Sequence, residues 1–103
     1  MAAELTPRER RALRAQAHHL EPVVTIGDAG LTPEVVREIE TTLKAHELIK
    51  IRVLGADRAG RAALVSAIGD ATGASPVQSI GKVLVMYRAR EREPGSTPAP
   101  QSR

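Results

Sequence analysis

The chain has 103 residues, which fits one domain with one hydrophobic core and short tails. It contains no cysteine, which excludes disulfides, thiolate nucleophiles and cysteine-ligated zinc, and no apolar run approaches the roughly 20 residues that cross a bilayer. There are 15 Lys and Arg against 12 Asp and Glu, a net charge of +3 that favours polyanionic partners. The N-terminus becomes charged where a signal peptide becomes apolar, so we expect a cytoplasmic protein.

The first predicted helix begins at Thr6-Pro7-Arg8-Glu9, where a capping box and an N-terminal proline coincide. It should end near His18 or His19, before Glu21-Pro22. At helical spacing, its narrow apolar stripe comprises Leu13, Ala17 and Leu20. One side of its remaining surface carries Arg10, Arg11, Arg14 and His18.

The middle of the chain predicts a strand, a helix and a second strand. Val23 to Ile26 is rich in β-branched residues and is expected to be a short buried strand that stops at Gly27. Thr32-Pro33-Glu34 starts the helix. The apolar stripe of this helix comprises Val35, Val36, Ile39 and Leu43. Leu48 to Leu54 alternates, which indicates a half-buried strand with Lys50 and Arg52 on its polar face.

The last part of the ordered chain predicts a helix and a hairpin. Asp57 caps a third helix that Gly73 terminates. The apolar face of that helix comprises Leu64, Val65, Ile68 and Ala71. Val77 to Ile80 and Val83 to Arg88 flank Gly81-Lys82, which suits a type II′ turn. The final strand is apolar on both faces, so we expect it to run centrally or to be covered on both sides.

The element order αβαβαββ defines the expected fold class. It predicts a compact two-layer α/β domain on a four-stranded mixed sheet, with parallel pairing where strands joined by a helix are adjacent. We expect this domain to occupy residues 1–92. Residues 93–103 are rich in Pro and Ser and are expected to form a disordered tail.

A glycine-flanked loop, Gly27-Asp28-Ala29-Gly30, lies between the first predicted strand and the second helix. Glycines there let the backbone approach a phosphate closely, and free amides at the helix start favour an anion. The alternative is a plain connector, and the Asp28 carboxylate would repel a phosphate.

The cations gather in two segments. Arg8 to Arg14 and Lys82 to Arg92 hold eight cations and two acids, a concentration that fits a polyanion partner as well as it fits a solvated surface that keeps the protein soluble. The basic residues of the first helix could form a continuous surface for a nucleic-acid backbone. Beyond that helix, this surface would be extended by Lys50, Arg52, Lys82, Arg88, Arg90 and Arg92.

Other chemistries lack the residues that they need. Tyr87 is the single aromatic residue, so RNA binding by stacked bases is disfavoured, and backbone and shape should dominate. His18, His19 and His46 have no spacing typical of metal ligands, and no phosphate-binding or nucleotide-binding fingerprint occurs. We therefore expect no enzyme, no cofactor, no metal and no small-molecule substrate.

Several motifs, in the same order, resemble the CRM (YhbY-like) domain family over roughly Leu5 to Arg90. They are Leu13 with Ala17-His18, Leu20-Glu21-Pro22-Val23-Val24, Ile26-Gly27-Asp28-Ala29-Gly30-Leu31-Thr32, His46-Glu47-Leu48-Ile49-Lys50-Ile51, Thr72-Gly73-Ala74 and Ile80-Gly81-Lys82-Val83-Leu84-Val85-Met86-Tyr87-Arg88.

The resemblance implies a fold similar to the C-terminal domain of translation initiation factor three. It also implies binding to ribosomal RNA in precursors of the large ribosomal subunit, through the GxxG loop at residues 27–30 and the basic surface. The family's basic positions would map onto Arg11, Arg14, Lys50, Lys82 and Arg88. The pair Asp28-Ala29 departs from the neutral or basic residues that family loops often carry.

Two other functions remain open at this point. One is a protein-interaction module that docks on a ribosomal protein or an assembly factor. The other is a binder of duplex DNA, which is disfavoured because the first helix offers only Gln16 for base readout. We expect a monomer that has no membrane partner.

Overall fold

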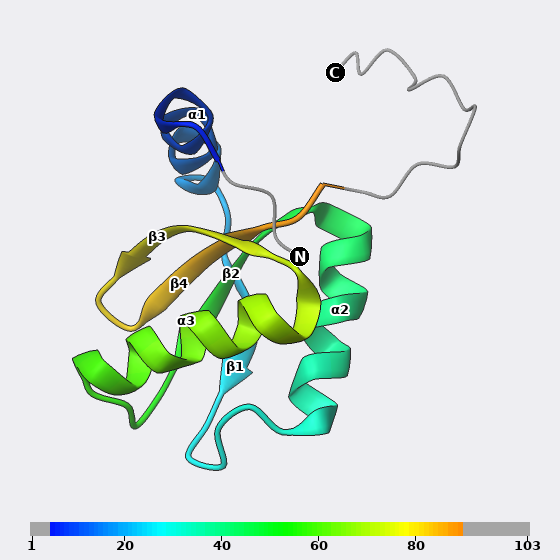
Figure 1. Ribbon diagram of the computed structural model, residues 1–103, viewed down its shortest axis with the longest axis vertical. Coiled ribbons are helices and arrows are strands. Elements are labelled where there is room, and N and C mark those ends of the chain that lie inside the picture. Colours follow the sequence, from blue (N-terminus) through cyan, green and yellow to red (C-terminus); the bar gives the residue numbers. More distant parts are fainter. Residues whose placement is uncertain (1–4, 90–103) are drawn as a thin grey trace.

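A computed structural model describes residues 5–89 of the chain. The elements follow the predicted order αβαβαββ (Figure 1). Their bounds are α1 (Pro7–Ala17), β1 (Pro22–Ile26), α2 (Pro33–His46), β2 (Leu48–Val53), α3 (Arg58–Thr72), β3 (Ser75–Ile80) and β4 (Val83–Tyr87). The expected boundary between domain and tail, at residues 92 and 93, lies outside the described residues.

The helices begin at the predicted caps. Thr6 and Glu9 form the capping box of α1: the Glu9 amide donates to Thr6 Oγ1 at 3.0 Å, and the Thr6 amide donates to Glu9 Oε1 at 2.9 Å. Thr32 and Asp57 cap α2 and α3 through single bonds of 3.2 and 2.8 Å. Each cap satisfies an amide that has no partner within its helix, so local sequence sets these starts.

The sheet has the strand order β1-β2-β4-β3, in which β1 and β2 are parallel and the other pairs are antiparallel. The strand that is apolar on both faces, β4, lies inside the sheet as predicted. Gly81 has a φ of 56° in the loop between β3 and β4, whereas Lys82 keeps a negative φ. That combination is expected of the predicted type II′ turn.

The sheet is covered on both faces, but unequally. Helices α2 and α3 cover one face and enclose the main core, which includes Ile39, Ile51, Ile68 and Leu84. Helix α1 covers part of the other face (Figure 1). There it encloses a smaller cluster of Ala17, Leu48, Val77 and Val85. The predicted fold class is confirmed, and the structure adds that α1 lies on the face opposite α2 and α3.

Three burial predictions are corrected. Strand β1 is half-buried instead of fully buried. Val23 is 48% exposed, because the strand register is irregular at this residue and no helix covers this face of the strand. Leu20 lies beyond the end of α1 and is 36% exposed, so it does not extend the apolar stripe. In α3, Ala71 is exposed and Thr72 is buried in its place.

Candidate nucleic-acid interface

Lys50 and Arg52 lie on the sheet face that carries α1. Leu48 packs against Ala17 of α1, and alternate residues of a strand share a face, so Leu48, Lys50 and Arg52 point the same way. Lys50 is partly buried and Arg52 is exposed. Side chains on this face follow one another at intervals of roughly 7 Å along β2, so Lys50 lies next to the α1 contact and Arg52 lies farther from it.

The part of this face that α1 leaves uncovered is the open sheet face. Cross-strand pairs place Val83 and Thr25 on either side of Arg52, and Ile80 beside Val83. The open sheet face comprises Thr25, Lys50, Arg52, Ile80 and Val83. None of the four strands that the structure describes contains Asp or Glu. The charged side chains that these strands carry, Lys50 and Arg52, are therefore both positive.

The predicted cations of α1 lie on one flank of that helix. Arg10 and Arg14 are partly buried beside the stripe that meets the sheet, whereas Arg11 and His18 are exposed. Their spacing places all four within about 100° of one another around the helix. This flank and the open sheet face belong to the same side of the molecule, because α1 packs on Leu48 directly beside Lys50.

Three connections meet at the end of the sheet away from α1. The Leu54 amide donates to the Ile26 carbonyl at 2.9 Å, and the Val53 amide donates to the Lys82 carbonyl at 2.7 Å. Consequently the GxxG loop, the connection from β2 to α3 and the β3–β4 hairpin are neighbours. Figure 1 shows the connection from β1 to α2 at the opposite end of the fold from α1. Lys50 and Arg52 lie between these two ends.

The GxxG loop is a tight turn. The Gly30 amide donates to the Gly27 carbonyl at 3.0 Å, and Gly30 adopts a φ of 77°, which disfavours a side chain. Apart from each glycine and its two chain neighbours, no residue has an atom within 4 Å of the place where a Cβ on Gly27 or Gly30 would stand. The backbone at both glycines is therefore open to a close approach, as a phosphate contact requires.

The Asp28 side chain packs against a second loop, in which Gly55 lies. Its carboxylate occupies the space that a Cβ at residue 55 would need, and Gly55 has a φ of 78°. The carboxylate thus turns toward the connection from β2 to α3. Sequence reasoning did not identify Gly55, because its requirement comes from a residue that is distant along the chain.

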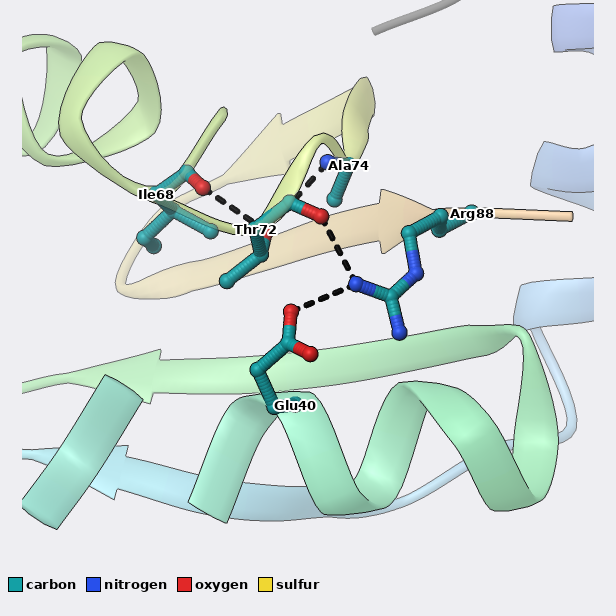
Figure 2. A network of polar contacts seen from close by, with 5 residues as sticks. All are labelled: Glu40, Ile68, Thr72, Ala74 and Arg88. Atoms are coloured by element: carbon teal, nitrogen blue, oxygen red, sulfur yellow. Dashed lines mark hydrogen bonds and ion pairs between the residues drawn. The ribbon is translucent and has the colours of Figure 1, made fainter. Parts of the chain in front are cut away.

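Arg88 occupies a polar network within the fold (Figure 2). Its Nη1 lies 2.5 Å from Glu40 Oε1 of α2 and 2.7 Å from the carbonyl oxygen of Thr72, at the end of α3. Thr72 Oγ1 in turn donates to the Ile68 carbonyl and accepts from the Ala74 amide. The structure therefore separates Arg88 from the other predicted cations, and Arg90 and Arg92 lie outside the described residues.

The fold and this face together define a class: a small α/β domain with an acid-free sheet surface bordered by a basic helix and a glycine loop. Within residues 5–89, Lys50 and Arg52 have no acidic partner, so both charges remain available to an anion. No group of three metal-ligating side chains forms among the described residues, and none of their helices is long and apolar enough to cross a membrane.

The chain belongs to the CRS1/YhbY (CRM) domain family, whose model matches residues 5–88. It is 47% identical to an RNA-binding protein of Haemophilus influenzae over 84% of this chain and 88% of that protein. It is 33% identical to the probable RNA-binding protein YqeI of Bacillus subtilis, over 82% and 88%. The fold resembles the solution structure of a Staphylococcus aureus protein, with a TM-score of 0.75, 33% identity and coverage of 90% and 95%.

Proposed function

We propose that this chain is an RNA-binding protein that holds ribosomal RNA during assembly of the large ribosomal subunit. One observation carries the RNA part of the proposal: Arg52 and Lys50 stand without acidic partners on a sheet face bordered by the basic flank of α1. The relatives named RNA-binding proteins support it. The ribosomal part rests on the family resemblance in the sequence motifs.

Binding is expected to depend on the sugar–phosphate backbone. Arg and Lys neutralise phosphates and release condensed counterions, so affinity should fall steeply as salt rises. The single aromatic residue, Tyr87, is partly buried beside the small cluster under α1. It offers no platform for successive bases, so RNA shape and phosphate spacing should govern selection.

The GxxG loop is proposed to make a backbone contact at the far end of the same RNA segment. Gly27 and Gly30 leave the loop backbone uncovered, and Asp28 directs its carboxylate toward Gly55. That orientation reduces the repulsion which the sequence predicts for a phosphate at this loop.

Crosslinking in cells, followed by sequencing of the attached RNA, tests the biological part of the proposal. We expect reads concentrated at one or a few sites of large-subunit precursor RNA. Reads that instead follow RNA abundance would contradict the ribosomal assignment. The matched sample is the Arg52→Glu variant, in which the same sites should lose most of their reads.

A further inference from the structure

A groove lies on the edge of the sheet, beside the proposed RNA surface, with which it shares Arg10. It has a volume of about 550 Å³ and runs along β3 between α1 and α3. Its lining includes Arg10, Arg58, Arg61, Val65, Val77 and Gln78. Arg58 and Arg61 of α3 lie outside both the open sheet face and the basic flank of α1.

The floor of this groove is a strand with one uncovered edge. In the described sheet β3 pairs only with β4 (Figure 1), so alternate amides and carbonyls along its outer edge have no strand to bond. Pro76 is exposed at the start of β3 and lacks an amide hydrogen, which limits pairing there. Ile80 is 52% exposed at the other end. The usable edge is therefore residues 77–80.

The two walls of the groove carry positive charge on opposite faces of the sheet. Arg10 comes from α1, whereas Arg58 and Arg61 come from α3. Arg61 Nη1 donates to the Ala56 carbonyl at 2.8 Å, which holds its side chain on the α3 surface. Arg10 and Arg58 have no acidic partner among residues 5–89, and none of the described lining residues is acidic.

These walls match the geometry of an added strand. Successive side chains of a β-strand point to opposite faces, so a strand paired with β3 would send one residue toward Arg10 and the next toward Arg58. Adjacent carboxylates would then meet both walls. Apolar neighbours in the same strand would contact Val65 on one side and Val77 on the other.

We infer that this groove binds an extended, acidic segment of a partner protein, which pairs with residues 77–80 as a fifth strand. A peptide supplies both amide donors and carbonyl acceptors, whereas the phosphodiester backbone of RNA offers mainly acceptors and would leave the β3 carbonyls unpaired. The chemistry of the edge therefore favours a peptide over RNA. This inference does not depend on the proposed RNA function.

The test uses a fluorescein-labelled, eight-residue peptide that is rich in valine and has two adjacent glutamates at its centre. We expect saturable binding in fluorescence anisotropy and, with ¹⁵N-labelled full-length protein, shifted and exchange-protected amides within residues 77–80. A peptide with glutamines in place of the glutamates should bind at least fivefold more weakly. A peptide that is N-methylated at alternate backbone nitrogens should not bind.

Two variants separate this site from the RNA surface. Arg58→Glu should weaken peptide binding about tenfold and leave RNA affinity unchanged, and the added Glu suits the first turn of α3. Arg52→Glu should do the reverse. Undiminished binding of the N-methylated peptide would overturn strand addition. Loss of RNA affinity in Arg58→Glu, together with no peptide binding, would show that the groove takes RNA instead.

Discussion

Arg88 Nη1 lies 2.5 Å from Glu40 Oε1, and this ion pair joins the chain just after β4 to the middle of α2 (Figure 2). The same nitrogen donates to the carbonyl of Thr72 at the end of α3. One guanidinium thus links the chain just after β4 to both helices that cover the main core, α2 and α3. This relationship assigns Arg88 a part in stability, whereas its sequence pattern predicts a part in RNA binding.

Replacing Arg88 with Met should therefore destabilise the fold. The change leaves Glu40 unpaired at a partly buried position and removes the bond to the Thr72 carbonyl, which together should cost about 1–3 kcal/mol. Chemical denaturation measures the free energy of unfolding, and the exposed Arg37→Met on α2 is the control. An unfolding free energy equal to that of the control would remove Arg88 from the stabilising network.

The contact between Asp28 and Gly55 predicts a coupled pair. Gly55→Ala places a Cβ against the Asp28 carboxylate at a φ of 78°, and the left-handed conformation alone should cost about 1–2 kcal/mol. In the double variant Asp28→Ala/Gly55→Ala, the destabilisation caused by the steric contact should disappear, whereas the cost of the left-handed backbone conformation should remain. A double-mutant cycle measured by thermal unfolding tests this coupling. Strict additivity of the two changes would mean that the carboxylate does not press on residue 55.

Arg52→Glu should weaken RNA binding without affecting the fold. Arg52 is exposed at the centre of the open sheet face, so its reversal removes one phosphate contact and adds a repulsive charge. We expect roughly tenfold weaker binding and a salt dependence whose slope is smaller by about 1. Filter binding at several salt concentrations gives both quantities. Arg37→Glu has the same charge change on α2 and should retain affinity.

Asp28→Asn should strengthen RNA binding if the GxxG loop contacts a phosphate. The substitution keeps the shape that packs on Gly55 and removes a negative charge beside the loop, so affinity should rise about twofold to fivefold. Asp70→Asn makes the same change at an exposed site of α3 and serves as the control. Equal effects of the two substitutions would indicate a response to net charge only, and the loop would then be a connector.

Local features of the chain were predictable. The caps at Thr6, Thr32 and Asp57 form as expected, and Gly73 ends α3 with a φ of 76°. The alternation in β2 correctly placed Lys50 and Arg52 on the face opposite the main core. These features depend on backbone groups and side chains that are three or four residues apart, or on the period of two in a strand. They can therefore be predicted from the sequence alone.

Long-range features were not predictable in the same way. Arg88 and Glu40 are 48 residues apart, and nothing near either residue signals the pairing. The need for glycine at position 55 arises from Asp28 in another loop. The groove along β3 exists because α1 and α3 approach the edge strand from opposite faces. Helical and strand periodicity show which side of an element is buried, whereas packing in three dimensions selects the element that covers it.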